Sequence, residues 1–362
     1  PAPAAPVAET MPVAAAAVAP SGLSPIQRTR ETLPDRYGAA RRLRRSLAAA
    51  AGRSDPGASP AAPPAGVTPS PAELTLPGAP GPMARWKRAL EDTDYLQRLN
   101  RAITRPQLSR CATIAVVSPK GGVGKTTITS LVGTLIAHLR RDLVLAVDAN
   151  PDYGSLGRVL CPSHTFFVDD LAAYFDSGAW SAPSMADLNA RLGSGPHGLR
   201  VLPAPTDPDR MSHIDCDTYR NIIGRLSDYA GVLLLDCGTG LHEPAARAAL
   251  AAADQVIVVS DADPATASLV AEAIQRIPVT APLTLVVNKM PAHGARLDLN
   301  RLAETLPDVD YVVVIPAEPK AASTLGVGAF CWDGVPVAWQ RSVRELAAVL
   351  IAGWASLGLE RQ

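Results

Sequence analysis

The sequence predicts an α/β fold with a doubly wound, mostly parallel sheet. Short apolar runs recur between residues 111 and 316, and helical segments separate most of them. This alternation is typical of a parallel sheet that helices cover on both faces. A glycine-rich loop joins the first apolar run to an amphipathic helix, as in folds that bind a ligand beside a strand end. The 252 residues of 111–362 are enough for one sizeable α/β core.

Residues 1–82 have a different composition and predict a disordered Pro/Ala-rich tail. They hold 16 of the 34 prolines, and Tyr37 is their one aromatic residue. Such a segment has little apolar surface to offset the entropy of ordering. Prolines interrupt the alanine runs of residues 1–20, which have no basic start, so no signal peptide is legible.

Charge divides the chain although the total is neutral. Residues 1–110 carry 15 Lys/Arg against 8 Asp/Glu, and residues 111–362 carry 19 against 26. The basic residues of the first part form two clusters, at Arg36, Arg41, Arg42, Arg44 and Arg45 and at Arg85, Lys87 and Arg88. Such clusters bind DNA phosphates or anionic lipid, and a solvated or self-docking tail explains them equally well.

A connector over residues 83–110 joins the tail to the α/β domain. From Met83 to Thr104, the apolar residues Trp86, Leu90, Leu96, Leu99 and Ile103 are spaced for one helix. Its apolar side docks either on the core or on a partner. The longest apolar stretch near the C-terminus, residues 347–359, is too short for a transmembrane helix.

Five cysteines without paired spacing predict a reducing cytosol and argue against an iron–sulfur or zinc site.

The glycine-rich loop predicts a nucleotide phosphate site. The run from Cys111 to Ser118 indicates a buried strand, and Thr126 to Arg140 an amphipathic helix. Between them, residues 119–127 read PKGGVGKTT. Glycines let backbone N–H groups turn toward a phosphate, and the helix N-terminus adds positive potential. By this pattern Lys125 reaches the β and γ phosphates, and the Thr126 hydroxyl binds Mg²⁺.

Two later apolar runs end in a carboxylate. Residues 143–148 read LVLAVD and residues 231–236 read GVLLLD, so each predicts a buried strand with an aspartate at its carboxyl end. Ligands of open α/β sheets bind at those ends. We therefore expect Asp148 and Asp236 to hold Mg²⁺. The alternative for Asp236 is a cap for the helix predicted over residues 242–253.

Three further strands are predicted over residues 255–260, 283–287 and 311–315. Asp263 followed by Pro264 indicates the start of a helix, with the aspartate as N-cap. Segments 166–192 and 204–229 are less regular, and their apolar residues predict ordinary packing of one helix each against the sheet.

The string KGGVGKTT resembles the deviant P-loop of the ParA/MinD ATPases, which are ATP-dependent molecular switches with a doubly wound parallel sheet. Relative to G-x-x-x-x-G-K-[ST], Pro119 takes the first glycine position and Lys120 precedes the glycine pair. The resemblance implies that Lys120 crosses a dimer interface to the partner's nucleotide. It further implies an ATP site made by Gly121, Gly122, Val123, Gly124, Lys125, Thr126 and Thr127, adenine contact by Asn288, a base-bordering loop at Pro316, and Mg²⁺ on Thr126, Asp148 and Asp236.

The first switch loop departs from the family pattern. Residues 149–156 resemble that loop, in which many relatives carry Asp-x-Asp, yet Asn150 stands at the second aspartate position. An amide cannot accept a proton from the attacking water as a carboxylate can. Either Asp152 substitutes for the aspartate or hydrolysis is slow, and the alternative role for Asp152 is to cap a short helix. We expect a cytoplasmic ATPase with low basal activity.

The tail, the basic helix, the residues VDANPD and a C-terminal AWQRSVRELAA together resemble the actinobacterial ParA/MinD-like ATPases associated with type VII secretion. Three functions remain open. The first is a switch that dimerises on ATP and regulates such a machine from the membrane periphery. The second is a partitioning ATPase that binds DNA at the nucleoid. The third is an interaction scaffold with little hydrolysis.

Overall fold

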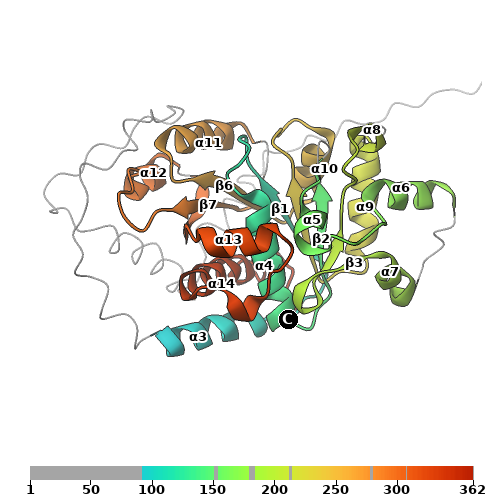
Figure 1. Cartoon of the computed structure of the whole chain (residues 1–362), viewed down its shortest axis with the longest axis horizontal. Helices are drawn as coiled ribbons and strands as arrows, with labels where there is room; N and C mark the ends of the chain where they lie inside the picture. Colours follow the sequence, from blue (N-terminus) through green and yellow to red (C-terminus); the bar gives the residue numbers. More distant parts are fainter. Residues whose placement is uncertain are drawn as a thin grey trace, which may run out of the picture. The chain divides into compact units, whose positions relative to one another are not determined.

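The computed structural model describes residues 92–361, except 151–153, 179–183, 212–213, 278–279 and 307 (Figure 1). The predicted disordered tail, both basic clusters, residues 83–91 of the predicted helix and Asp152 lie outside the described residues.

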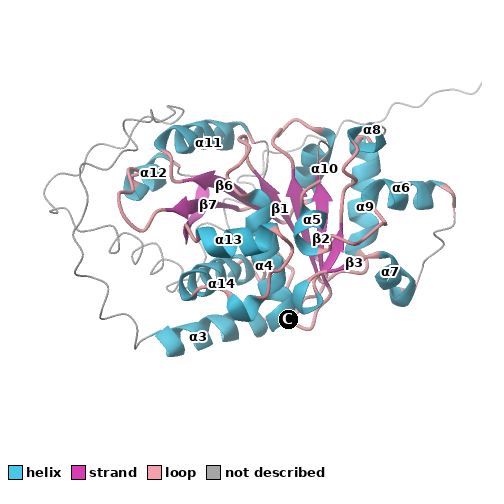
Figure 2. Cartoon of the chain, in the orientation of Figure 1, coloured by secondary structure: helices cyan, strands magenta, loops and turns pink. Residues whose placement is uncertain are grey.

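One eight-stranded sheet forms the centre of the described part, in the order β3-β4-β2-β5-β1-β6-β7-β8 (Figure 2). Every neighbouring pair is parallel except β3 with β4. The strands are β1 (Ala112–Val117), β2 (Val144–Ala149), β3 (Gly193–Ser194), β4 (Arg200–Leu202), β5 (Val232–Cys237), β6 (Gln255–Asp261), β7 (Leu283–Met290) and β8 (Val309–Pro316). The predicted fold class is confirmed.

Helices occupy most connections between the strands (Figure 1). They are α3 (Asp92–Thr104), α4 (Lys125–Leu139), α5 (Leu156–Leu160), α6 (Val168–Asp176), α7 (Met185–Arg191), η3 (Pro196–Gly198), α8 (Pro208–Met211), α9 (Cys216–Ser227), α10 (Pro244–Ala252), α11 (Pro264–Arg276), α12 (Leu299–Thr305), α13 (Pro319–Gly326), η4 (Trp332–Gly334) and α14 (Val337–Ala352). Asp263 caps α11 through the Thr266 N–H, with Pro264 at the first position, as predicted.

The sheet separates two apolar layers. Residues of α4 and α14 pack on one face, and residues of α6, α9, α10 and α11 pack on the other. Strand side chains alternate between the faces: Val232 and Leu234 of β5 face α4, and Leu233 and Leu235 face the opposite layer. This period of two also directs Asp236, two residues after Leu234, to the α4 face. In β2, Val144 and Ala146 place Asp148 on that face in the same way.

The connector helix docks on its own core. In α3, Leu99 and Ile103 are buried, and the helix packs on α14. Tyr95 donates to the Glu345 carboxylate at 2.9 Å. The sequence predicted that this helix docks either on the core or on a partner, and its described part docks on the core.

Sequence periodicity did not reveal the short strands β3 and β4, because two and three residues are too few to show alternation. Among the residues that the structure describes, no helix is both long and apolar enough to cross a membrane.

Candidate functional site

The glycine-rich loop follows β1 and leads directly into α4, which begins at Lys125. Gly124 has φ 100° and Gly122 has φ 77°, a left-handed conformation that L side chains rarely adopt. A Cβ on Gly124 would lie 2.3 Å from the Asn288 Nδ2, whereas one on Gly122 would meet nothing within 4 Å. The loop therefore needs glycine at 124 for two separate reasons.

Lys125 and Thr126 begin α4 beside the Asp236 carboxylate. The Thr126 hydroxyl donates to Asp236 Oδ2 at 2.7 Å, and the Thr129 hydroxyl donates to Oδ1 at 3.0 Å. Lys125 is only 9 % exposed. Burial lowers the pKa of its ammonium group, and the nearby Asp236 opposes that shift. Asp236 is thus held by the P-loop helix, whereas Glu243 is the N-cap of α10, so the cap alternative for Asp236 is wrong.

Asp148 and Asp236 are paired neighbours on β2 and β5, and both are buried. Asp148 accepts from the Leu156 N–H at 2.9 Å and the Asn150 N–H at 3.2 Å. Burial raises the pKa of both carboxyls, and Asp236 raises that of Asp148 further. A cation would relieve this repulsion. Two carboxylates and a hydroxyl are hard oxygen donors, so the residues present fit Mg²⁺.

Lys120 lies against its own chain. Its ammonium group donates to the Thr266 hydroxyl and is 3.9 Å from Asp263 Oδ2, at the first turn of α11. The side chain is 42 % exposed. A role across a dimer interface stays a prediction, and it would require Lys120 to leave these partners.

Asn288 is buried beside the P-loop and donates to the Val123 carbonyl at 2.9 Å. The next residue, Lys289, has φ 56° and donates to the Gly122 carbonyl. The end of β7 therefore fixes the loop from one side. Pro316 ends β8, and its carbonyl accepts from the Trp339 indole at 2.7 Å. Contact of Asn288 or Pro316 with adenine stays a prediction.

The first switch loop is only partly described. Asn150 follows β2, and Asp152 lies outside the described residues. Helix α5 begins at Leu156, and its N-cap is Ser155. The Ser155 and Thr126 hydroxyls are 2.8 Å apart.

Sequence reasoning missed several contacts of the site. Thr129 could have been found, because a residue three positions after Thr126 lies on the same helix face. The roles of Ser155, Thr266 and Lys289 have no such local signal, since each partner is at least 29 residues away.

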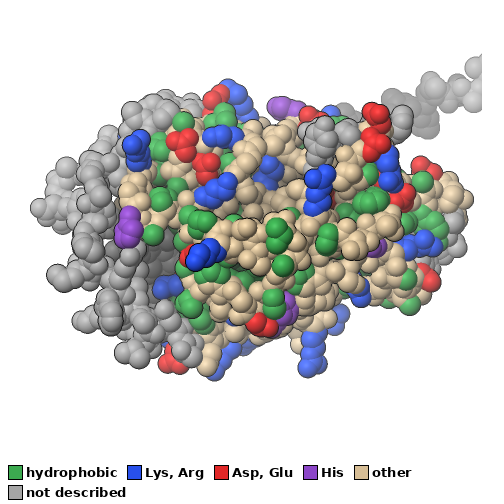
Figure 3. Space-filling model, viewed as in Figure 1, with side chains coloured by type: hydrophobic (Ala, Val, Ile, Leu, Met, Phe, Trp, Pro, Cys, Tyr) green, Lys and Arg blue, Asp and Glu red, His purple; other side chains and the backbone are tan. Residues whose placement is uncertain are grey.

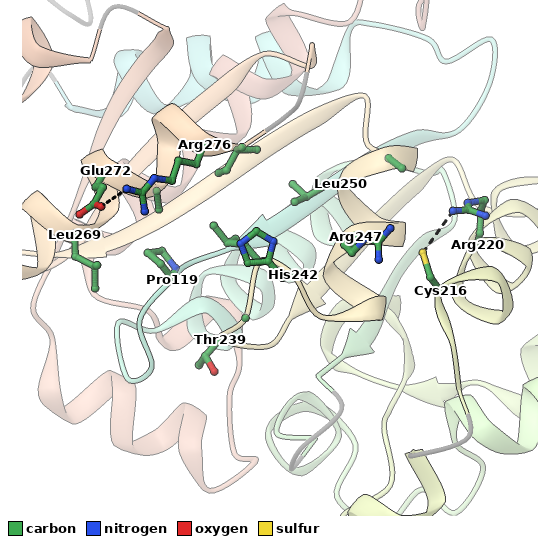
Figure 4. Close-up of a pocket in the computed structure, with 15 residues that line it drawn as sticks. Pro119, Cys216, Arg220, Thr239, His242, Arg247, Leu250, Leu269, Glu272 and Arg276 are labelled. Atoms are coloured by element: carbon green, nitrogen blue, oxygen red, sulfur yellow. Dashed lines mark hydrogen bonds and ion pairs between the residues drawn. The ribbon is translucent and has the colours of Figure 1, made fainter. Parts of the chain in front are cut away.

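A cavity of about 610 Å³ opens between α9, α10 and α11 (Figure 4). Pro119 of the P-loop lines it, as do residues 239–242 after β5. Arg220, Arg247 and Arg276 surround a mostly apolar wall. The loop of residues 239–242 therefore forms one side of this cavity. On the face drawn in Figure 3, basic and acidic side chains are interspersed.

Among curated proteins, the chain is similar to the ESX-1 secretion-associated protein EspI of Mycobacterium tuberculosis. The two are 28 % identical over 246 residues, which is 66 % of this chain and 36 % of EspI. The chain thus matches about a third of the length of this relative. It is also 27 % identical over 218 residues to the septum site-determining protein MinD of Synechocystis, covering 57 % of this chain and 76 % of that protein.

Solved structures share the fold. A ParA family ATPase from Chlorobium tepidum superposes with a TM-score of 0.56 at 15 % identity, covering 66 % of this chain and 98 % of that chain. MinD from Pyrococcus horikoshii, complexed with Mg-ADP, gives a TM-score of 0.52 at 20 % identity, with 66 % and 94 % covered. The model of the CobQ/CobB/MinD/ParA nucleotide binding domain matches residues 114–325, which include the loop, both aspartates and Asn288. The chain therefore belongs to the CobQ/CobB/MinD/ParA nucleotide-binding family.

Proposed function

We propose that this protein is an ATP-dependent switch that binds ATP with Mg²⁺, dimerises in that state, hydrolyses ATP slowly and regulates a type VII secretion machinery. The observation that carries the proposal is the convergence of Lys125, Thr126, Asp148 and Asp236 at the carboxyl ends of β2 and β5, beside the glycine-rich loop.

The nucleotide step follows from the charges at this site. The loop presents N–H groups and the α4 N-terminus, both of which attract phosphate. Lys125 adds an ammonium group whose pKa is lowered by burial. A bound phosphate would stabilise the charged form of this group. When bound, Mg²⁺ supplies a positive charge that neutralises the phosphates. On this chain, Asp236 would exchange the Thr126 hydroxyl bond for the ion and keep its bond from Thr129.

The switch step rests on Lys120. In the structure Lys120 contacts the first turn of α11, next to a loop that would hold the γ-phosphate. A phosphate offers this ammonium group a stronger, charge-assisted hydrogen bond than the Thr266 hydroxyl does. Release of Lys120 from α11 would then couple nucleotide binding to assembly.

Association with secretion is supported by the similarity to EspI, whose name places that protein with ESX-1 secretion. The match covers 36 % of EspI, so the partner and the direction of regulation belong to the proposal.

One observation favours a second candidate, a nucleotide-binding scaffold with little turnover. Asn150, at the position of the usual second aspartate, can orient a water but cannot take its proton. Hydrolysis then depends on positioning and charge alone.

Calorimetry with Mg-ATP tests the nucleotide step. Lys125→Ala should lose measurable binding, because the phosphates lose their principal cation. Arg276→Ala is the matched control, since it also removes one positive charge, from an exposed pair with Glu272 at the far end of α11. Equal affinities in Lys125→Ala and the control would remove the assignment of the P-loop.

Light scattering with a slowly hydrolysed ATP analogue tests assembly. Lys120→Ala should bind the analogue and remain a monomer, whereas the wild type should dimerise. Thr266→Ala is the control, because it removes the hydroxyl that Lys120 contacts and keeps the lysine. A Lys120→Ala dimer, or a monomeric Thr266→Ala, would contradict the role across the interface.

A further inference from the structure

Four side chains with metal-binding chemistry converge away from the nucleotide site. His138 lies in the last turn of α4, His197 in the turn η3, and Cys331 and Asp333 at η4. One ligand atom each from His197, Cys331 and Asp333 lies within 4.8 Å of the others. Three segments that are far apart in the sequence therefore place nitrogen, sulfur and oxygen donors together.

Hydrogen bonds fix which nitrogen of His197 carries the proton. The Trp332 backbone N–H can only donate, and it lies 3.2 Å from His197 Nε2. Nε2 therefore presents its lone pair, and the neutral ring carries its proton on Nδ1. That Nδ1 is 3.1 Å from the Nδ1 of His138. The His138 ring thus accepts a hydrogen bond from His197 Nδ1 and orients the His197 ring, as partners of metal-binding histidines do.

Burial lowers the pKa of the His138 imidazole, and the neighbouring His197 lowers it further. Asp333 opposes this shift.

Two of the three donor pairs have a spacing close to that of a tetrahedral zinc site. Cys331 Sγ lies 3.8 Å from His197 Nε2 and 3.9 Å from Asp333 Oδ2. Zinc bonds of about 2.0–2.3 Å at tetrahedral angles separate such donors by about 3.3–3.8 Å. The third pair, His197 and Asp333, lies within 4.8 Å, so an ion would draw these two side chains closer together.

The backbone of His197 also has an uncommon conformation. His197 has φ 55°, a left-handed conformation that is uncommon outside glycine. Such a residue is maintained when the surrounding structure requires it. Here the conformation accompanies an imidazole held between α4 and η4 by both of its nitrogens.

We propose that His197 Nε2, Cys331 Sγ and Asp333 Oδ2 bind Zn²⁺, with His138 as the positioning residue for His197. The mixed nitrogen, sulfur and oxygen set suits zinc, and three protein ligands leave a fourth position for water. The ion takes the lone pair that the Trp332 N–H now uses, so binding costs this hydrogen bond. Binding converts the Cys331 thiol to a thiolate and releases its proton. The ion then fastens η4, just before α14, to the turn before β4.

Titration with Co²⁺ as a zinc probe tests the site. The full 362-residue chain is used without a polyhistidine tag and with excess Mg²⁺ to occupy carboxylate sites. We expect one equivalent of Co²⁺ to give thiolate-to-cobalt charge-transfer absorption with tetrahedral d–d bands, and Zn²⁺ to displace it. Cys331→Ser should abolish the charge-transfer absorption and Asp333→Asn should weaken binding. His138→Ala should weaken binding about 10–100-fold.

Cys216→Ser is the matched control, because it removes a partly exposed thiol at the start of α9. It should bind Co²⁺ as the wild type does. Circular dichroism of each variant separates lost ligation from lost folding, and Cys331 is exposed enough for serine to replace it. A wild type without charge-transfer absorption, or a Cys331→Ser variant that keeps it, would overturn the proposal and leave a thiol–imidazole hydrogen-bond cluster.

Discussion

Substitution of Gly124 by alanine tests whether the P-loop conformation is fixed by two separate constraints. The residue has φ 100°, and an alanine Cβ would lie 2.3 Å from the Asn288 Nδ2. Gly122 is the matched control, because it has φ 77° and open space around its Cβ position.

The expected magnitudes differ between the two positions. A left-handed conformation costs an L residue about 1–2 kcal/mol, and Gly122→Ala should lose only that. Gly124→Ala must also displace Asn288, which breaks its bond to the Val123 carbonyl. A buried acceptor left without its donor costs about 1–3 kcal/mol more. We therefore expect a loss of about 2–5 kcal/mol for Gly124→Ala.

Urea unfolding in nucleotide-free buffer measures both values. A double-mutant cycle with Asn288→Ala isolates the contact, because without the amide Gly124→Ala should cost only about 1–2 kcal/mol. Equal losses for Gly122→Ala and Gly124→Ala, or a cycle without coupling, would show that Asn288 does not restrain the loop and would refute this reasoning.

Further predictions concern pH, turnover and the tail. Because burial raises the pKa of Asp148 and Asp236, the folded state binds more protons than the unfolded state above the ordinary carboxyl pKa of about 4. Without Mg²⁺, the free energy of unfolding should therefore fall as pH rises above that value, and Asp236→Asn should flatten the slope of stability against pH. Phosphate-release assays should show slow basal ATP hydrolysis, which Asn150→Asp raises and Asp152→Asn lowers at unchanged ATP affinity; fast turnover that is insensitive to both would contradict the interpretation of the switch loop. If residues 28–88 bind DNA or anionic vesicles by charge, affinity should decrease steeply with salt and vanish when the four arginines of 41–45 become alanine; retention after deletion of residues 1–82 would move the site elsewhere.

Much of the nucleotide site was predictable because its chemistry is local. The P-loop is one continuous string between a strand and a helix, and Asp148 and Asp236 each end an apolar run. The six strands predicted by residue range are all present, since buried parallel strands are continuous apolar runs. The helix predicted around Leu99 and Ile103 is present as well, in its described part.

The sequence by itself determined the fold class, the phosphate loop and the aspartates that end two of the strands, because neighbouring residues encode these features. Only the tertiary structure decided which ends meet. The strand order places β5 between β1 and β2, and this makes Asp148 and Asp236 neighbours although 88 residues separate them. The tertiary structure also decided that the Lys120 ammonium group donates to the Thr266 hydroxyl. The tertiary structure also brings Cys331 to His197 across 134 residues, the contact on which the proposed zinc site rests. Such contacts depend on how the crossovers return the chain to the sheet, and no local pattern of residues records that path.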